Sequence, residues 1–582
     1  MFKLYKNLKA VDWILIVCIV GITVAQVYFT MTLVDYVSGI VEAIQIAYST
    51  EETGDIWYNG GMMILYAACS ALCQVVTGFI ASHVSSDLSR RLRSRVFTKV
   101  EGFSVAEVNK FSTASLITRS TNDIQQVQMA NIMILRMLIS APITAIWAIC
   151  KISATSWELT TAAAVAIVLL VIGILAIMLT VLPKFKVVQK LTDRLNGVTR
   201  ENLTGIRVVR AYNAENYQQE KFDKANDDFT KVQTFTGRVI ALMNPMMTII
   251  MNGISLAIYL IGAYLIIDGT TKYAPIVSFM MLVTQVVMAF VMLLMMFIML
   301  PRAMVAAKRI NEVLDTPDSI TDPETEKQTT ETGTVEFKDV SFKYPDADGY
   351  VIKDISFKAE KGQTIAFIGS TGSGKSTLIN LVPRFYDATD GEILVDGVNV
   401  KDLKQHTLHQ KIGYVPQKGV LFTGTVAENI GYGGVTDRAT IEDAAKIAEA
   451  DEFIQHMEKG YESEIAQGGK NVSGGQKQRI SIARAVATHP EIMIFDDSFS
   501  ALDYKTDKKV RENLKEHLSG TTNLIVAQRI GTIMDADKII VLDKGKAVGV
   551  GTHKELLETC DVYKEIALSQ LSAEELGIKE VL

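Results

Sequence analysis

The chain has 582 residues, of which 49% are hydrophobic and 21% are charged, and its mean hydropathy is +0.22. Together these figures suggest a membrane part joined to a soluble part. The net charge of −6 gives no sign of nucleic-acid binding, and the five scattered cysteines have neither a disulfide framework nor metal-ligand spacing.

Six stretches in the first half have the length and apolarity of transmembrane helices, at about 11–37, 58–84, 130–151, 157–182, 239–267 and 275–300. The first lacks a small-residue cleavage site, so we interpret it as a span rather than a signal peptide. Loop 86–128 holds seven Lys and Arg residues and loop 184–238 holds eleven, whereas 38–57 holds none. This alternation predicts that both termini and both long loops are cytoplasmic.

The two long basic loops are helix-rich, and segments 89–100 and 189–209 look like spans that continue beyond the membrane. Such extensions suit a machine driven by a cytoplasmic domain, because force must cross the membrane interface. No Asp or Glu sits centrally in any predicted span, whereas a carrier coupled to protons or sodium normally needs an intramembrane carboxylate. The energy source is therefore expected elsewhere in the chain.

Two predicted spans carry patterned faces that are candidates for a substrate path. The fifth span has five polar side chains on one helical face: Asn244, Thr248, Asn252, Ser255 and Tyr259. The sixth has a stripe rich in methionine, whose flexible side chain accepts many ligand shapes: Met281, Gln285, Met288, Met292, Met295 and Met299. Helix packing is the alternative for both stripes. Arg136, near the cytoplasmic end of the third span, is either a substrate counter-charge or a snorkelling side chain.

Beyond a basic helix at 302–309 the chain becomes acidic and threonine-rich, and then alternates between strands and helices. We expect an all-α six-helix transmembrane domain over 1–310, a linker over 311–333 and an α/β P-loop domain over 334–582.

The glycine-rich motif of the second half follows an apolar strand at 364–368 and opens a helix, which is the context that a phosphate-binding P-loop requires. Its glycines let backbone N–H groups turn toward phosphate oxygens. Lys375 is expected to reach the β- and γ-phosphates of ATP, and Ser376 to offer its hydroxyl to Mg²⁺. The residues predicted to contact the nucleotide are Gly369, Ser370, Thr371, Gly372, Ser373, Gly374, Lys375, Ser376 and Thr377.

Two further motifs belong with the P-loop. A buried strand at 492–495 ends in Asp496, a carboxylate placed to hold Mg²⁺. Between the two lies Ser473-Gly474-Gly475-Gln476, which opens a helix and exposes free N–H groups there. Together the three motifs resemble those of the ABC transporter ATPases, whose signature is Ser-Gly-Gly-Gln in this place.

The resemblance covers essentially the whole chain, and the membrane half looks like the six-helix exporter type. It implies that Tyr344 stacks on adenine, that Gln417 senses Mg²⁺ and contacts the membrane half, and that Asp503 is the D-loop aspartate. It also implies that the signature completes the ATP site of a partner subunit. The long cytoplasmic loops should then end in coupling helices near Val105–Phe111 and 206–214.

This sequence departs from the family pattern at two hydrolytic positions. Asp497 stands where the family has a catalytic glutamate, and its side chain is one methylene shorter. Gln528 replaces the switch histidine, and glutamine cannot carry the positive charge of a histidinium. These losses, beside an intact P-loop and signature, resemble the degenerate-site subunit of bacterial heterodimeric ABC exporters.

We therefore expect a half-transporter in the bacterial cytoplasmic membrane that works with a second, non-identical ABC half. The pair should use ATP and Mg²⁺ to export amphipathic or hydrophobic compounds of the multidrug type, without nucleic acid and in contact with membrane lipids. This chain's own site should hydrolyse ATP slowly. Alternatives are the same machinery carrying peptide or lipid, and an ATP-gated channel or regulator; the uncharged fifth and sixth spans argue against an ion pore.

Overall fold

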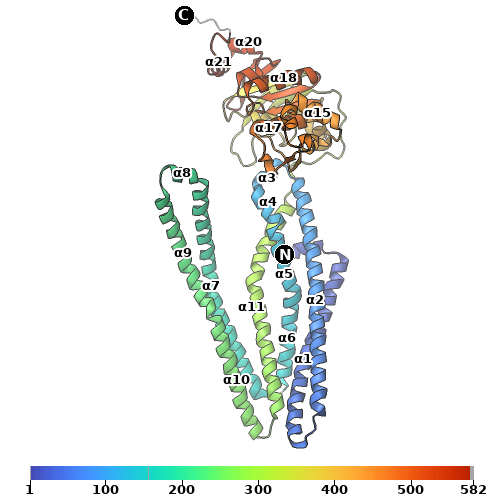
Figure 1. Cartoon of the computed structure of the whole chain (residues 1–582), viewed down its shortest axis with the longest axis vertical. Coiled ribbons are helices and arrows are strands. Elements are labelled where there is room, and N and C mark those ends of the chain that lie inside the picture. Colours follow the sequence, from blue (N-terminus) through green and yellow to red (C-terminus); the bar gives the residue numbers. More distant parts are fainter. Residues whose placement is uncertain (1, 155, 577–582) are drawn as a thin grey trace. The chain divides into compact units, whose positions relative to one another are not determined.

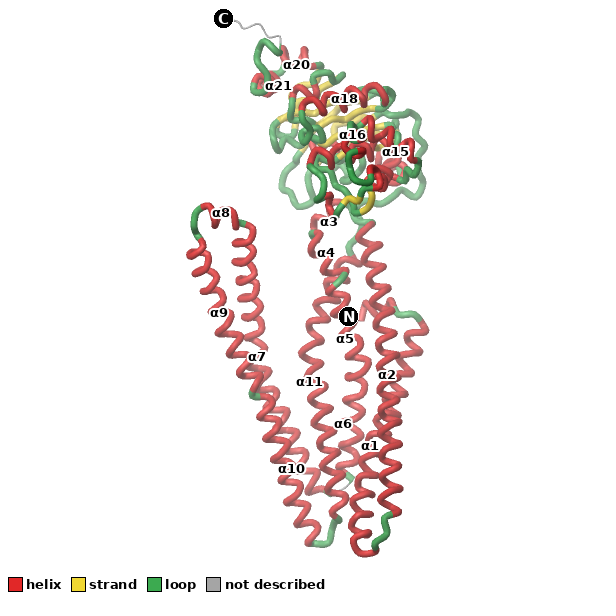
Figure 2. The backbone as a smooth tube through the Cα atoms, viewed as in Figure 1, coloured by secondary structure: helices red, strands yellow, loops and turns green. Residues whose placement is uncertain are grey.

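The computed structural model describes residues 2–154 and 156–576, which divide into two compact units. Unit 1 comprises Met1–Lys99 and Ala114–Thr316, and unit 2 comprises Val100–Thr113 and Pro317–Leu582. Long helices make up unit 1, whereas the strands of the described chain lie in unit 2, as Figure 2 shows.

Among the described residues, six helical stretches are long and apolar enough to cross a membrane, one for each predicted span. They are Ala10–Ser49, Gly54–Glu101, Thr113–Ser153, Trp157–Thr204, Glu215–Ile267 and Tyr273–Leu293. Figure 1 labels the individual helices, which are α1 (Ala10–Thr50), α2 (Gly54–Glu101), α4 (Thr113–Ser120), α5 (Asn122–Met133), α6 (Ile139–Ser153), α7 (Trp157–Thr204), α8 (Ile206–Ala211), α9 (Glu215–Ala241), α10 (Met243–Ile267) and α11 (Tyr273–Asp315).

The third span is not one continuous α-helix. A π-helical segment, η2 (Ile134–Leu138), joins α5 to α6. Pro142 lies in the first turn of α6 and has no N–H to donate to the carbonyl of Leu138, one turn earlier. A local change of hydrogen-bond register just before this proline is the expected consequence, and such π segments are frequent at functional sites.

The helices continue beyond the predicted spans. The two helices α2 and α7 run on through the segments predicted to leave the membrane. Helix α11 continues to Asp315 and so includes the start of the predicted 311–333 linker, because Ile310 and Val313 extend its buried face. The N-terminal 3-10 turn η1 (Phe2–Asn7) packs in the same unit, where the Tyr5 hydroxyl donates to Asn131 Oδ1 at 3.0 Å.

Unit 2 is an α/β structure with two main sheets and a short pair, β7–β8. The strand orders of the main sheets are β2-β1-β4-β5 and β12-β11-β3-β10-β9-β6. The strands are β1 (Val335–Phe342), β2 (Ile352–Ala359), β3 (Thr364–Gly369), β4 (Asp390–Val395), β5 (Val398–Asn399), β6 (Ile412–Val415), β7 (Gly424–Thr425), β8 (Glu464–Ile465), β9 (Ile492–Asp496), β10 (Thr522–Val526), β11 (Lys538–Asp543) and β12 (Lys546–Gly551).

The helices of unit 2 cover these sheets and bury two hydrophobic cores. They are α3 (Val105–Phe111), α12 (Lys375–Ile379), α13 (Gln405–Gln410), α14 (Val426–Ile430), α15 (Arg438–Ile447), α16 (Asp451–Gln455), α17 (Gly474–Ala487), α18 (Tyr504–His517), α19 (Ile530–Ile533), α20 (His553–Thr559) and α21 (Asp561–Leu568).

Helix α3 coincides with the first predicted coupling helix and packs within unit 2. Ser104 begins the helix by accepting from the N–H of Ala106, and its hydroxyl lies 3.0 Å from that of Ser319. Ala106 packs against one of the two cores, and Asn109 Nδ2 lies 3.4 Å from the hydroxyl of Tyr386. A short piece of the first long loop is thus held by the α/β unit.

Candidate nucleotide site

The site lies where four neighbouring parallel strands end. In the order β3, β10, β9, β6, each strand pairs in parallel with the next. The segments that follow them are the P-loop, Gln528, the Asp496–Asp497 pair and Gln417 respectively. Since the carboxyl ends of parallel strands meet at one edge, residues separated by up to 160 positions come together there.

The P-loop begins at the end of β3 and closes around its own lysine. A Cβ at Gly369 would lie only 2.1 Å from the carbonyl oxygen of Leu542, so no other residue fits there. Gly374 has a left-handed φ of 96° and begins α12. The Lys375 ammonium donates to the carbonyls of Gly369 and Ser370, both at 2.8 Å. Burial lowers the pKa of Lys375, while Asp497 and Asp496 act in the opposite direction.

The two predicted Mg²⁺ ligands are in direct contact. The Ser376 hydroxyl donates to Asp496 Oδ1 at 2.7 Å. Burial raises the pKa of Asp496, an effect that the Ser376 hydrogen bond opposes. A hydroxyl and a carboxylate oxygen fit Mg²⁺, which takes oxygen ligands and often completes its shell with waters and nucleotide phosphates. Among the residues that the structure describes, no cluster of three or more His, Cys, Asp or Glu could hold a metal.

The Asp497 carboxylate is held by two amide groups. Its Oδ2 accepts from Nε2 of Gln528 at 2.8 Å and from Nε2 of Gln417 at 3.1 Å. Asp497 also has a left-handed φ of 49°, which turns the chain sharply after β9. The two positions that depart from the family pattern therefore touch each other. Sequence reasoning named these three residues but did not foresee their mutual bonds.

A residue that the sequence gave no reason to choose holds the segment containing Gln528. Gln570, just after α21, donates through Nε2 to the carbonyl of Gln528 at 2.8 Å. Its Oε1 accepts from the N–H of Ile530, also at 2.8 Å. The Gln570 side chain thus hydrogen-bonds to the backbone on both sides of Arg529. No motif or spacing in the sequence could have indicated this contact.

Tyr344 lies beside the P-loop helix. Its hydroxyl is 2.9 Å from that of Thr377, and its ring packs edge-on against Phe342 and Tyr386. The structure thus brings two of the predicted nucleotide contacts together.

The signature segment begins helix α17 as a reciprocal cap. Gln476 N–H donates to Ser473 Oγ, and Ser473 N–H donates to Gln476 Oε1. A Cβ at Gly474 would meet no atom within 4 Å, so this helix start is open, whereas one at Gly475 would approach the Ala501 carbonyl at 3.4 Å.

Gln478, two residues after the signature in α17, connects the signature helix to the loop that contains Gln417. Gln478 is 1% exposed; its Nε2 donates to the Pro416 carbonyl at 3.0 Å, and its Oε1 accepts from Gly419 N–H at 2.9 Å. Sequence reasoning missed this bridge. Asp503, the predicted D-loop aspartate, caps α18 by accepting from the N–H of Thr506 at 3.0 Å. This bond holds the pKa of Asp503 below its usual value.

The two predicted substrate stripes are largely uncovered in this single chain. On α10, Ser255 is half-buried and the other four members are exposed: Asn244, Thr248, Asn252 and Tyr259. On α11, Met281 and Gln285 are half-buried, whereas the exposed members are Met288, Met292 and Met299. The side chain of Met295 lies outside the described residues.

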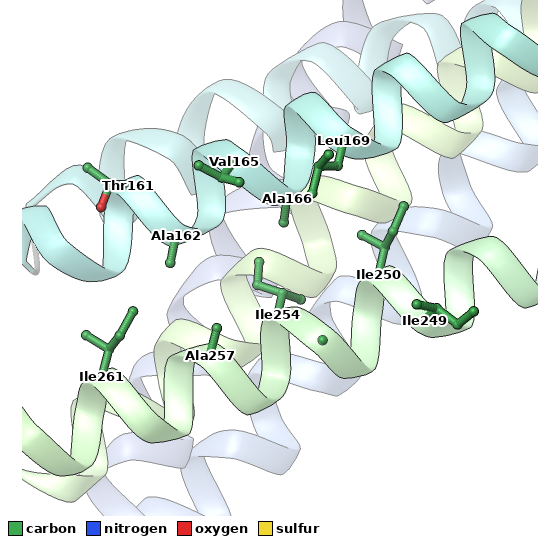
Figure 3. A pocket seen from close by; sticks show the side chains of 11 residues that line it. Thr161, Ala162, Val165, Ala166, Leu169, Ile249, Ile250, Ile254, Ala257 and Ile261 are labelled. Carbon is green, nitrogen blue, oxygen red and sulfur yellow. The ribbon is translucent and has the colours of Figure 1, made fainter.

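A separate cavity of about 520 Å³ lies between α7 and α10, and Figure 3 shows its lining side chains on these two helices. Its walls are almost wholly aliphatic, with small residues one turn apart on each helix, such as Ala162 and Ala166. No member of either stripe lines it. It is open and has no convergent polar groups, so it suits a hydrocarbon surface rather than a polar ligand.

Comparison with known families gives two matches that together cover most of the chain. Residues 13–290 match the ABC transporter transmembrane region, and residues 352–500 match the ABC transporter family. These matches confirm the predicted fold class, an all-α membrane domain followed by an α/β ATPase domain.

Similar proteins extend over nearly the full length. An uncharacterized ABC transporter ATP-binding protein of Mycobacterium tuberculosis is 40% identical over 532 residues, covering 90% of this chain and 91% of that protein. The ATP-dependent lipid A-core flippase of Pseudomonas aeruginosa is 34% identical over 503 residues, covering 85% and 82%. A bacterial Atm1-family ABC exporter with ATP bound has the same fold, with a TM-score of 0.79, 24% identity and coverage of 95% and 97%.

Proposed function

The chain belongs to the ABC transporter family, and we propose that it is the degenerate-site half of a heterodimeric exporter of amphipathic compounds. It is an integral membrane half-transporter whose second unit is an ABC-type ATPase domain and therefore binds ATP. Half-transporters of this kind function as dimers. What we propose beyond this is the asymmetry of the two ATP sites, the nature of the partner and the class of cargo.

The observation that carries the proposal is the state of Asp497. Hydrolysis needs a group that orients the attacking water and a charge that stabilises the γ-phosphate in the transition state. One oxygen of the Asp497 carboxylate already accepts from two amides, and the side chain is a methylene shorter than glutamate. Gln528 brings no positive charge. A site of this composition binds ATP with Mg²⁺ on Ser376 and Asp496, and turns it over slowly.

The signature of this chain serves the other site. The open start of α17 offers backbone N–H groups and a helix dipole to an anion, the arrangement that receives a γ-phosphate. We assign it to the ATP held by the partner's P-loop. The partner is then a non-identical half that supplies the catalytic glutamate and histidine that this chain lacks.

The cargo class rests on the uncovered faces of α10 and α11. Their polar and methionine stripes would line a path between two halves that accepts amphipathic compounds of several shapes. Lipid is the second candidate, because relatives of this chain from two bacteria are described as ATP-dependent lipid A-core flippases. In this proposal the chain lies in the bacterial cytoplasmic membrane with both termini and unit 2 on the cytoplasmic side, and α3 and the α8 region, 206–214, are the coupling helices.

The asymmetry can be tested with variants of Asp497 and Gly474 in the co-purified complex. Asp497→Asn should change ATP turnover little. Gly474→Asp should lower it by orders of magnitude, because charge repulsion beside a γ-phosphate in a dehydrated pocket is worth several kcal/mol. Gly474→Asn is the matched control, with nearly the same size and no charge. A Cβ at Gly474 meets no atom, so misfolding of this chain is not expected to explain a loss. An unaltered rate in Gly474→Asp, or a collapse in Asp497→Asn, would refute the assignment.

A further inference from the structure

One positive charge stands inside an apolar run of the membrane unit. Arg136 lies in the third predicted span, 130–151, six residues from its cytoplasmic end. At a rise of about 1.5 Å per residue this places its Cα roughly 9 Å inside that end. A cation at such depth costs free energy unless it meets a counter-charge or reaches the lipid head groups.

Several other charged side chains of the membrane unit are paired. Lys151 pairs with Asp35 at 2.5 Å, and Lys272 pairs with Glu42 at 2.6 Å. Arg91 contacts Asp12 at 2.7 Å. Arg136 differs: its side chain is exposed, and within residues 2–154 and 156–576 no hydrogen bond, ion pair or ring contact engages it. Its guanidinium is thus free to bind an anion from outside this chain.

The local backbone positions this guanidinium over a small residue. Arg136 is the central residue of the π-helical segment η2, where the helical register changes. A Cβ at Gly78 of α2 would lie 3.9 Å from Arg136 Cζ, and no other atom would be within 4 Å of it. Gly78 is itself six residues from the cytoplasmic end of the second predicted span, 58–84. Arg136 and Gly78 are therefore predicted to lie at the same depth in the membrane.

The face of α2 around Gly78 offers both polar and apolar groups. Gln74 and Ser82, one turn to either side of Gly78, are exposed. Val75 and Phe79 are exposed apolar neighbours, at 54% and 74%. A head group could therefore meet the guanidinium and the polar side chains, while a hydrocarbon chain lies on the apolar ones.

We propose that Arg136 binds the anionic head group of an amphiphile, a phosphate or carboxylate on a hydrocarbon chain, at the level of the cytoplasmic leaflet. A guanidinium suits such a group because it donates two parallel hydrogen bonds to its oxygens. The proposal narrows the cargo of the proposed exporter to anionic amphiphiles if the ligand is transported. It needs no nucleotide, so it can fail while the assignment of the ATP sites stands.

The test uses the purified transporter in phosphatidylcholine nanodiscs without ATP, with dodecyl phosphate and dodecyltrimethylammonium as probes. Arg136→Gln should weaken dodecyl phosphate binding at least tenfold and leave binding of the cationic probe unchanged, and Arg136→Lys should lose less. Arg302→Gln removes a charge from an exposed position of α11 and should have no effect. Unchanged dodecyl phosphate binding in Arg136→Gln, or an equal loss in Arg302→Gln, would overturn the proposal.

A second variant keeps the charge and fills the space beside it. Gly78→Leu should also weaken dodecyl phosphate binding, and it tests the site even if the Arg136 variants do not fold. Full binding in Gly78→Leu would contradict a site beside Gly78. Adding phosphatidylglycerol to the nanodiscs identifies the source of the ligand. If phosphatidylglycerol competes with dodecyl phosphate, the ligand of the site is a membrane lipid. If phosphatidylglycerol does not compete, the ligand is a cargo molecule.

Discussion

The side chain of Gln570 should control how often the segment around Gln528 opens. Gln570→Ala removes the two 2.8 Å hydrogen bonds to the Gln528 carbonyl and the Ile530 N–H. Each is worth about 1 kcal/mol, and because Gln570 is exposed, water can replace part of that. The loss of about 1–2 kcal/mol should raise local opening by a factor of about 5–30. Release of Gln528 should also loosen its bond to Asp497.

Amide hydrogen exchange measured by mass spectrometry reports this opening. A peptide covering 526–532 should exchange faster in Gln570→Ala, whereas a peptide covering the buried strand β9 should not change. The matched control is Ser569→Ala, which loses one local hydrogen bond to the Ile566 carbonyl and leaves both hydrogen bonds of Gln570 intact. Equal exchange of 526–532 in Gln570→Ala and the parent protein would refute the proposed role of Gln570. Faster exchange throughout unit 2 would indicate a general loss of stability instead.

Three further outcomes are expected. Gln478→Leu leaves the Pro416 carbonyl and the Gly419 N–H without their partner and should destabilise unit 2 by about 2–4 kcal/mol, seen as a lower melting temperature. Asn252→Leu and Ser255→Leu should change which drugs stimulate the ATPase at unchanged stability, whereas lower stability with the same drug profile would favour packing. Thr270→Cys should react with an impermeant thiol reagent outside intact cells and Asn226→Cys should not; labelling of the latter would contradict the six-span topology.

The resemblance to the ABC transporter ATPases explains why much of the nucleotide site could be predicted. Gln417, Asp497 and Gln528 were each chosen because they match positions of the family pattern, and each follows a strand of the parallel sheet, whose carboxyl ends meet at one edge. What could not be predicted is how the side chains bond there, since the amides of Gln417 and Gln528 converge on one oxygen only after β6, β9 and β10 are placed side by side. Contacts such as that of Gln570 have no fixed spacing and leave no pattern in the sequence.

In the membrane unit the apolar runs predicted the number of long helices but not where they end. Hydropathy stops at the edge of the apolar region, and it was the helix-rich polar segments 89–100 and 189–209 that predicted the continuation of α2 and α7. The extension of α11 to Asp315, into the predicted linker, was not predicted. The π-helical segment at 134–138 escaped prediction as well, because its cause is the missing N–H of Pro142 inside an otherwise regular apolar run. The sequence identified Arg136, and only the structure placed it against Gly78.

The central claim is that the ATP bound to this chain's P-loop is hydrolysed slowly while the partner's is not. Photoaffinity labelling tests it directly, with 8-azido-ATP carrying the label on either the α- or the γ-phosphate. After incubation at a temperature that permits turnover and subsequent irradiation, this chain should retain the α- and γ-labels equally, whereas the partner should retain the α-label alone. Loss of the γ-label from this chain at the partner's rate would contradict the account.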